Sequence, residues 1–405
     1  MFLRRAKSLM QSETPTAIQR LFTNKAKLLL LLFSIMFSLV CVEVALRLFF
    51  PPGFFVPSSV GSAYQRHDVL HHVHRPCSSA LEKNRNAYDD FCVNIYFNSA
   101  GFRSAQEYSV SKPENVTRVM ILGDSFVEAR QVWEHQMVSN IFGKLLANER
   151  DREIEVLAQG VSSWSPVIEW LYFSTEGYRY SPDLLFLLAS FNDISDDYRR
   201  YYRIARFDKD GIPVAVPSKD PHVKPDDQHS FLQKHSALYA LLGSRVERLS
   251  ENLKKQQIVA DYRSREALSV SPLAIFNEEL SDEDHELINA TFSHIRRLYQ
   301  FAGEHGTRMV LVLIPFPHQV SIDEWRAGKQ LFGIPVDYVE KSTQLQDSFS
   351  AFAAKNDIPF LDLLPYLKRS NQRIFFEYDG HFTPAGHRVV AEALHSFTMH
   401  EGLLR

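Results

Sequence analysis

The chain has 405 residues, of which 45% are hydrophobic, and 45 Lys and Arg residues against 48 Asp and Glu residues give it a formal net charge of −3. The balanced charge excludes a nucleic-acid binder that depends on bulk positive charge, and the apolar content excludes a disordered protein. The 3 cysteines are too few for a disulfide scaffold, and none has the spacing of a zinc ligand pair.

The first predicted element is an apolar helix. Leu28 to Val42 carries no charge, and the apolar character continues past Glu43 as far as Phe50. This length is about that of one membrane span. We interpret residues 28–50 as a transmembrane signal anchor. A cleaved signal peptide and a buried core helix are the alternatives, although no small-x-small cleavage site follows the apolar run.

The charges before this helix predict its orientation. Residues 1–27 carry six basic side chains and one acidic side chain. Positive charge favours the cytoplasmic side, so residues 1–27 are expected in the cytoplasm and residues 51–405 outside it, in the periplasm if the source is bacterial. In an oxidising compartment, Cys77 and Cys92 either form a disulfide or remain free thiols, whereas Cys41 lies in the span.

After the span, short apolar runs alternate with amphipathic segments. Strands are predicted at 118–122, 153–157, 184–189, 309–314 and 359–363, with helices after residue 126, at 167–177, 282–305 and 338–355, and after Pro384. This alternation predicts an α/β fold with three layers, α/β/α, in which helices cover both faces of a central, mostly parallel sheet. Such folds bind their ligands at the carboxyl ends of the strands.

The alternation is interrupted between residues 198 and 280. This stretch is polar, rich in charges and prolines, and has one predicted helix at 236–253. We interpret it as an insertion that serves either as a lid or as a surface directed toward the membrane. Four of its tyrosines either stack on sugar rings or, as is more common, are ordinary packing or surface residues: Tyr198, Tyr201, Tyr202 and Tyr239.

The sharpest motif is Gly123-Asp124-Ser125-Phe126, directly after a predicted strand. At this strand-to-helix turn, the Ser125 hydroxyl is a candidate nucleophile beside backbone amides that stabilise negative charge. The alternative is a capping box, in which Ser125 and Glu128 each bond the other's backbone amide. The two roles do not exclude each other.

A serine nucleophile needs a base and a carboxylate that orients the base. The segment Asp379-Gly380-His381 offers both, with His381 to accept the Ser125 proton and Asp379 to hold the other ring nitrogen. The alternative is that Asp379 supports a turn at Gly380 and that His381 is a surface residue.

The oxyanion of an attacked ester also needs hydrogen-bond donors. The backbone amides of Ser125 and Gly160 and the side-chain amide of Asn192 are the candidates, since each follows a predicted strand. Taken singly, a glycine is more often a turn residue and an asparagine more often a helix cap.

Together these four blocks resemble those of the SGNH hydrolases, also called the GDSL esterase/lipase family, over about residues 95–400. The resemblance implies an SGNH/flavodoxin-like fold and a catalytic triad of Ser125, Asp379 and His381. It also implies an oxyanion hole formed by Ser125, Gly160 and Asn192. The upstream segment Asn98-Ser99-Ala100-Gly101-Phe102-Arg103 resembles one found in membrane-anchored members of the family.

The sequence departs from the family pattern in two places. The usual last block is D-x-x-H, whereas Asp379 and His381 are separated by one residue, as in a subset that resembles polysaccharide O-acetyltransferases. This leaves His387 as a less favoured base. The first block has Phe126 where the family usually has leucine, which changes an apolar position and should not affect the chemistry.

The expected function is that of a membrane-anchored, extracytoplasmic serine esterase or acyltransferase. It would act through an acyl-enzyme on O-acyl groups, above all O-acetyl groups, of an envelope glycan or lipid, without a metal or an organic cofactor. The acylated substrate and the membrane are the expected partners, and nucleic acid is not. The competing hypothesis is a non-catalytic glycan-binding or assembly component that kept the fold. The choice between hydrolysis and transfer, and the oligomeric state, stay open.

Overall fold

The computed structural model describes residues 17–49, 63–85, 88–149, 152–218, 236–239, 241–242, 280–328 and 341–404. The chain divides into two compact units. One consists of Met1–Pro57 and His229–Leu253, and the other of Ser58–Gln228 and Lys254–Arg405. The second unit carries the central sheet and the first carries a long helix.

The core of the larger unit is a parallel sheet. In the described part of the chain it has five strands in the order β11-β10-β7-β5-β6. The strands are β5 (Val116–Gly123), β6 (Glu153–Gly160), β7 (Leu184–Ala189), β10 (Arg308–Leu313) and β11 (Phe360–Asp362). The order reverses at β5, which pairs with β6 on one side and with β7 on the other. In an open parallel sheet this reversal is where ligands bind.

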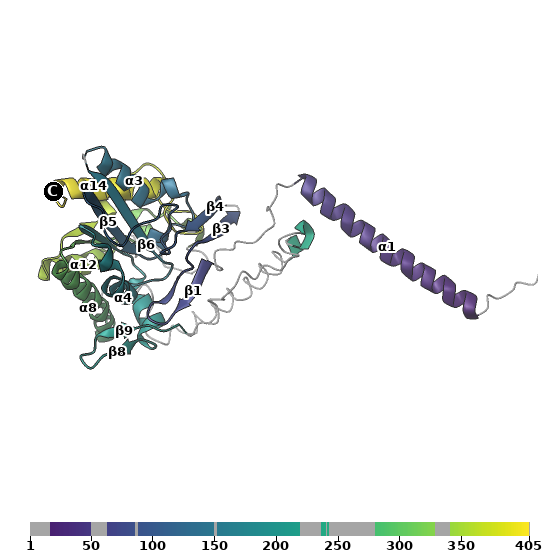
Figure 1. The fold of residues 1–405 in the computed structure, drawn as a ribbon, viewed down its shortest axis with the longest axis horizontal. Helices are drawn as coiled ribbons and strands as arrows, with labels where there is room; N and C mark the ends of the chain where they lie inside the picture. Colours follow the sequence, from purple (N-terminus) through teal and green to yellow (C-terminus); the bar gives the residue numbers. More distant parts are fainter. Residues whose placement is uncertain are drawn as a thin grey trace, which may run out of the picture. The chain divides into compact units, whose positions relative to one another are not determined.

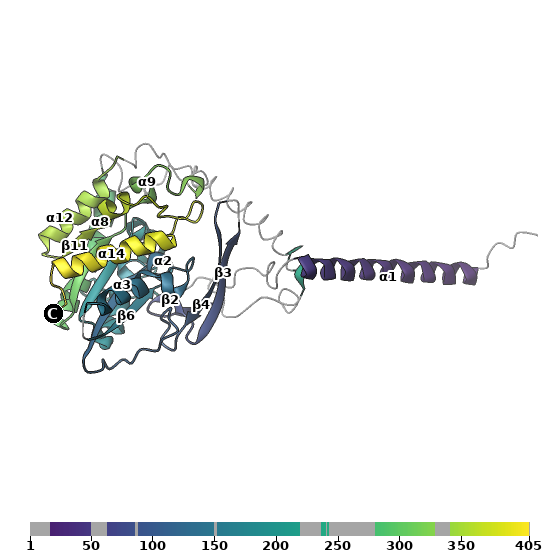
Figure 2. The same ribbon diagram turned by 90° about the horizontal axis from the view of Figure 1, so that it is seen from above.

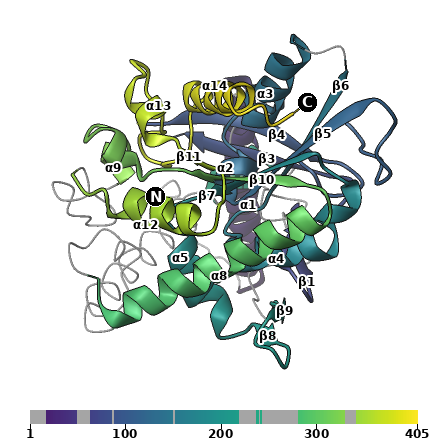
Figure 3. The same cartoon turned by 90° about the vertical axis from the view of Figure 1, so that its left-hand side faces the viewer.

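Helices cover both faces of the sheet, as predicted (Figures 1 and 3). On one face, α3 (Val138–Ala147) packs against α14 (Pro384–His400). On the other lie α4 (Pro166–Thr175), α8 (Asp282–Glu304) and α12 (Gln344–Lys355). The three-layer α/β/α architecture is therefore confirmed.

Strand β7 shows why its sequence is continuously apolar. All its residues are buried, and successive side chains enter opposite layers. Leu185 and Leu187 belong to the same apolar cluster as α4 and α8, whereas Leu184 and Phe186 belong to the cluster of α3 and α14. A central strand covered on both faces does not need the alternation of polar and apolar residues that a half-exposed strand shows.

Smaller elements surround this sheet. Three antiparallel pairs, which were not predicted, consist of β1 (Tyr64–His67) with β2 (His71–His74), β3 (Ser78–Arg85) with β4 (Asp90–Phe97), and β8 (Arg206–Phe207) with β9 (Pro213–Ala215). Figure 2 shows β3 and β4 as a two-stranded ribbon. Short helical turns complete the unit: α2 (Ser125–Glu128), η2 (Glu134–Gln136), η3 (Gly177–Tyr180), α5 (Asp193–Asp196), η4 (Asp197–Tyr202), α9 (Pro317–Val320) and α13 (Leu364–Lys368).

The disulfide alternative for Cys77 and Cys92 is wrong. Both thiols are free and exposed. In this ribbon, Cys92 of β4 lies opposite Lys83 of β3. Cys77 lies six residues before Lys83 in the chain, directly before the start of β3. At about 3.3 Å per residue this separation is about 20 Å, far more than a disulfide spans.

Most of the predicted insertion, including residues 243–253 of its predicted helix, lies outside the described residues. Residues 237–239 and 241–242 are helical, in agreement with the start of that helix. Of the four tyrosines considered for sugar stacking, Tyr201 is fully buried and is a packing residue. Tyr202 and Tyr239 are exposed.

The smaller unit contains α1 (Ala17–Phe49). Its segment Lys25–Phe49 is long and apolar enough to cross a membrane. The most apolar stretch of this segment is not buried by the described part of the chain. The interpretation of this helix as a buried core helix is therefore wrong. Residues 229–253 of the predicted insertion group with this helix.

Candidate active site

Ser125 is the first residue of α2, directly after β5. The residue that caps this helix is Asp124, whose Oδ1 accepts a hydrogen bond from the backbone N–H of Phe126 at 2.9 Å. The capping box between Ser125 and Glu128 is therefore wrong, and the Ser125 hydroxyl makes a different contact.

That contact is with a histidine. Ser125 Oγ lies 2.7 Å from Nε2 of His381, and Nδ1 of the same ring lies 2.7 Å from Oδ1 of Asp379. This is the order in which a carboxylate fixes a histidine so that its far nitrogen accepts a serine proton. His387 is instead buried within α14, where burial lowers its pKa to about 3.

Charge reinforces the geometry of this chain of contacts. Burial alone would lower the pKa of His381, but the Asp379 carboxylate and its hydrogen bond raise it above its ordinary value. Burial would raise the pKa of Asp379, but His381 and Arg130 lower it below its ordinary value. Asp379 therefore stays ionised and favours a protonated His381 ring.

The loop that carries Asp379 is held by a residue the sequence did not reveal. The Asp89 carboxylate, just before β4, accepts hydrogen bonds from the backbone amides of Glu377 at 2.8 Å, Tyr378 at 2.9 Å and Asp379 at 2.8 Å. Asp89 is 4% exposed, so these three bonds are shielded from water.

Trp325 supports the same loop. Its Nε1 donates to the Tyr378 carbonyl at 3.0 Å. Its ring also occupies the space beside Gly380, where an added Cβ would lie 2.8 Å from Nε1. Gly380 has φ +85°, so both the backbone conformation and the close approach of Trp325 require glycine between Asp379 and His381.

The far end of α2 is also held. Arg103 donates from its guanidinium to the carbonyl oxygen of Glu128 at 2.7 Å, and to those of Ala129 and Val132. Arg103 is 4% exposed and ends the upstream Asn98–Arg103 segment singled out in the sequence. One buried side chain thus satisfies three carbonyls at the end of the turn that begins with Ser125.

Glu128 adds a second connection between α2 and the first strands. Its Oε1 accepts from the Tyr64 hydroxyl at 2.5 Å and lies 3.1 Å from His74 Nε2. Burial would raise the pKa of Glu128, but Arg130, His74 and Tyr64 lower it to about 2. The ionised carboxylate therefore holds α2 to β1 and β2.

Gly160 lies directly against α2. It pairs with Gly123 at the carboxyl ends of β6 and β5. A Cβ on Gly160 would lie 2.2 Å from the backbone nitrogen of Glu128 and 2.5 Å from the backbone carbon of Val127. Only glycine lets the serine turn pack this closely on the neighbouring strand.

Asn192 lies after β7, at the same edge of the sheet. It is the N-cap residue of α5, as the alternative interpretation had it, but its side chain makes no capping hydrogen bond and is turned to other partners. Its Nδ2 donates to Asp196 at 3.1 Å and, at 3.4 Å, to Asp124, the neighbour of Ser125. The fold thus brings Gly160 and Asn192 to the same strand-order reversal as Ser125 and its contacts with His381.

Buried carboxyl groups lie next to this site. Asp124, Glu169, Asp193 and Asp197 are buried, and burial raises the pKa of each, to about 7 for Asp197. Ser190 Oγ lies 3.0 Å from both Asp124 Oδ2 and Asp193 Oδ1. A hydroxyl has only one hydrogen. If both contacts are hydrogen bonds, at least one of the two carboxyl groups must therefore be protonated and donate to Ser190.

Comparison with known proteins gives a family match. The model described as the GDSL-like lipase/acylhydrolase family matches residues 121–389. No curated protein matches the chain. The match runs from within β5 into α14 and includes Ser125, Gly160, Asn192, Asp379 and His381.

Three solved structures are similar to this chain. TesA has 13% identity and a TM-score of 0.39, with 71% of this chain and 100% of that chain covered. LAE5, an alpha/beta hydrolase enzyme from the metagenome of Lake Arreo, has 12% identity and a TM-score of 0.38, with coverage of 71% and 96%. A catalytic mutant of Axe2, an acetylxylan esterase from Geobacillus stearothermophilus, has 11% identity and a TM-score of 0.37, with coverage of 69% and 93%.

Proposed function

We propose, from the premise that this chain belongs to the GDSL-like lipase/acylhydrolase family and is a serine ester hydrolase, that Ser125, His381 and Asp379 are its catalytic triad. The observation that carries the proposal is the pair of 2.7 Å contacts from Ser125 Oγ to His381 Nε2 and from His381 Nδ1 to Asp379 Oδ1. Each group then has the neighbour that its chemical role requires.

In the acylation step, Ser125 Oγ attacks the ester carbonyl carbon while its proton passes to His381 Nε2. The carbonyl oxygen becomes an oxyanion, which the backbone amides of Ser125 and Gly160 and the side-chain amide of Asn192 stabilise. When the intermediate collapses, the bond to the leaving oxygen breaks and His381 donates its proton to the departing alcohol. The acyl group is then an ester of Ser125.

In the second step, His381 takes a proton from the incoming hydroxyl, whose oxygen attacks the acyl-enzyme. Water releases the free acid, and a sugar or lipid hydroxyl forms a new ester. Ser125 regains its proton from His381 in either case. Hydrolysis and acyl transfer therefore use the same residues and differ only in the acceptor.

The proposed substrate is an O-acyl ester, above all an O-acetyl ester, of an envelope glycan or lipid. The single residue between Asp379 and His381, a spacing that resembles polysaccharide O-acetyltransferases, supports this choice. The proposed location is extracytoplasmic, with α1 as the membrane anchor. The apolar segment Lys25–Phe49 and the excess of basic residues before it support this topology.

The decisive experiment tests whether Ser125 is the nucleophile. The full chain in detergent is treated with a fluorophosphonate probe, and p-nitrophenol release from p-nitrophenyl acetate is followed. We expect Ser125→Ala to lose labelling and to lower kcat by about 10³-fold or more, whereas Ser370→Ala, on the loop after α13, keeps both. A folded wild-type chain that neither labels nor turns over would instead favour the non-catalytic component.

A second experiment tests Asn192. If its amide binds the oxyanion, Asn192→Ala lowers kcat about 10²-fold to 10³-fold with little change in KM. Asp196→Asn, which alters one present partner of that amide, is the matched control and should retain most of kcat. Equal losses in both variants would show that Asn192 acts only through its carboxylate neighbours.

The topology has its own test, because Cys77 and Cys92 are free and exposed. A membrane-impermeant maleimide should label both thiols in intact cells, in a fraction that resists extraction by alkaline carbonate. Labelling that appears only after lysis would place the larger unit in the cytoplasm. That result would not affect the proposed triad.

A further inference from the structure

Glu43 is an unusual residue for the surface of an apolar helix. It is the only charged residue between Lys27 and Arg47. An ionisable side chain within a membrane span is costly unless it has polar partners. Glu43 has four donors: Arg47 Nε at 2.7 Å, Ser236 Oγ at 3.0 Å, and the backbone amides of Ala237 at 2.9 Å and Leu238 at 2.8 Å.

Three of these donors belong to residues far along the chain. Ser236 precedes the helical residues 237–239, so Glu43 satisfies the first amides of a helical turn that have no partner within the turn itself. The Glu43 side chain is 20% exposed as a result. The contact therefore fixes residues 236–239 to the outer part of α1, within one compact unit.

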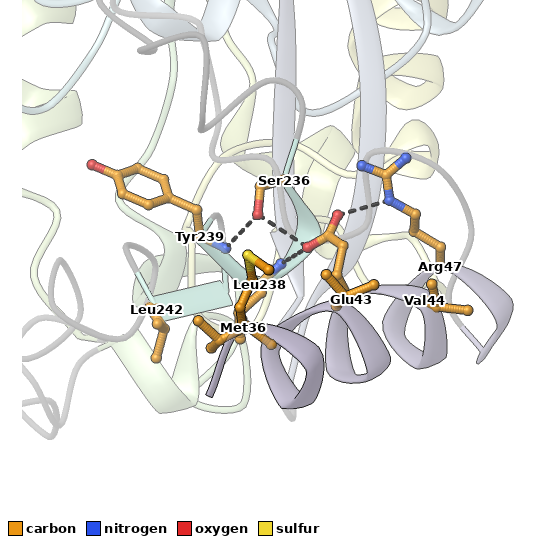
Figure 4. A pocket seen from close by; sticks show the side chains of 10 residues that line it. Met36, Glu43, Val44, Arg47, Ser236, Leu238, Tyr239 and Leu242 are labelled. Carbon is orange, nitrogen blue, oxygen red and sulfur yellow. Dashed lines mark hydrogen bonds and ion pairs between the residues drawn. The ribbon is translucent and has the colours of Figure 1, made fainter. Parts of the chain in front are cut away.

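Apolar side chains flank this polar contact. Figure 4 shows a pocket with Met36, Glu43 and Val44 on one wall and with Leu238, Tyr239 and Leu242 on the other. Its volume is about 590 Å³. Tyr239 is 44% exposed and Leu242 is 56% exposed, so this wall is open as well as apolar.

The position of the pocket along α1 matches the edge of a bilayer. Glu43 lies 18 residues after Lys25, which is about 27 Å along an α-helix. The hydrocarbon core of a bilayer is about 30 Å thick. If Lys25 lies at the cytoplasmic boundary, Glu43 lies near the outer boundary, a level at which tyrosine side chains are enriched.

We propose that residues 236–242 form a second membrane-contact segment, fixed to α1 by Glu43, and that acyl chains of bilayer lipids fill the pocket between them. Lipid is the occupant because the α1 wall of the pocket is continuous with the apolar surface of Lys25–Phe49, whose most apolar stretch is left unburied by the described part of the chain. This inference rests on the proposed anchoring by α1 and is independent of the triad.

The test places single cysteines on the full chain in a background where Cys41, Cys77 and Cys92 are serine. A bimane label is attached at Leu242→Cys, at Phe37→Cys in the span, or at Met399→Cys on α14. The protein is reconstituted in phosphatidylcholine vesicles with or without doxyl-labelled lipid. We expect doxyl lipid to reduce fluorescence at positions 37 and 242 at least twofold, and aqueous iodide to quench the label at 399.

The role of Glu43 is tested in the same vesicles. Glu43→Ala should remove at least half of the lipid quenching at position 242 and leave position 37 unchanged. Ser34→Ala is the matched control, because the Ser34 hydroxyl donates to the Leu30 carbonyl of its own helix, and it should change neither position.

Quenching at 37 without quenching at 242 would overturn the inference and keep the anchor. Unchanged quenching at 242 in Glu43→Ala would overturn the proposed fixation. Absence of quenching at both positions would overturn both the anchor and the inference. Fluorophosphonate labelling of Ser125 reports on the triad in every case.

Discussion

Asp89 Oδ2 lies 2.8 Å from the backbone nitrogen of Asp379, a contact that joins residues 290 positions apart in the chain. Because Asp379 orients His381, Asp89 is a positioning residue for the proposed triad. It connects the start of β4 with the loop before α14.

We expect Asp89→Ala to lower kcat by about tenfold to 100-fold, because a small displacement of catalytic groups has effects of this size. Three partly buried amides would also lose their acceptor, at up to about 1–3 kcal/mol each if they stay unsatisfied. Steady-state kinetics over a range of pH values and thermal unfolding are the measurements. Asp89→Asn, which keeps one acceptor oxygen, should recover part of kcat, and the neighbouring Asp90→Ala is the control. An unchanged pH profile and kcat in Asp89→Ala would remove its positioning role.

The pH dependence follows from His381. Its ring must be neutral to accept the Ser125 proton, and its pKa is raised above 6.5. Activity should therefore fall as the pH drops through a value above 6.5. Asp379→Asn removes the largest influence that opposes the effect of burial on the pKa of His381, so the acid limb of kcat/KM should move to lower pH. We also expect kcat to fall by about 10³-fold to 10⁴-fold because the ring loses its orientation. An acid limb at the same pH in both proteins would contradict this assignment.

Arg103→Lys tests whether the guanidinium holds α2. Lysine keeps the charge but has one nitrogen in place of the planar fork that reaches three carbonyls. We expect a lower melting temperature and a fall in kcat of about tenfold, since the end of the serine turn is loosened. Arg388→Lys, on the exposed side of α14, should behave as wild type. Retention of full activity and stability in Arg103→Lys would show that a single donor suffices.

Gly160→Ala tests the close packing of α2 on β6. The added Cβ would meet backbone atoms at 2.2 Å and 2.5 Å, so the turn that begins with Ser125 must move. We expect a loss in kcat of about 100-fold and a destabilisation of about 1–3 kcal/mol. Gly303→Ala, in α8, is the control because its Cβ would meet nothing within 4 Å. Wild-type kinetics in Gly160→Ala would mean that α2 tolerates the shift.

Asp197→Asn tests the buried carboxyl groups. The pKa of Asp197 is raised from 3.8 to about 7 by burial, so the folded chain binds a proton that the unfolded chain has lost between these values. The contribution of Asp197 to wild-type stability should therefore decrease as pH rises from about 4 to about 7. Asparagine removes this dependence. The difference in melting temperature, variant minus wild type, should therefore be larger at pH 8 than at pH 5. Asp210→Asn, on an exposed turn, should show no such trend.

The sequence was most informative where one structural cause dominates. Strand β7 was predicted at its observed bounds because burial on both faces makes it continuously apolar. The bounds of α8 and α14 follow from their periodicity and from Ser281 and Thr383, which cap them. Ser125, Gly160 and Asn192 could be selected because each lies at the end of a strand at one edge of the sheet. Asp379 and His381 could be selected because a serine nucleophile needs a base and an orienting carboxylate.

The supporting residues could not be selected in this way. Asp89 directly precedes strand β4 and looks like an ordinary turn residue, since its partners lie 288 to 290 positions later. Arg103 belongs to a segment that was singled out, but its partners are backbone carbonyls, which every residue has. Strands β2 and β3 were missed because HHVH and SSALEKNR lack the apolar content typical of strands.

The contact between Ser125 and His381 joins residues that are 256 positions apart. Ribosomes add roughly 5–20 residues per second, so Ser125 is made roughly 10–50 s before His381. Throughout that interval the nascent chain carries a serine hydroxyl without a base. The order of biosynthesis therefore keeps the nucleophile inert until the segment around His381 docks beside β5.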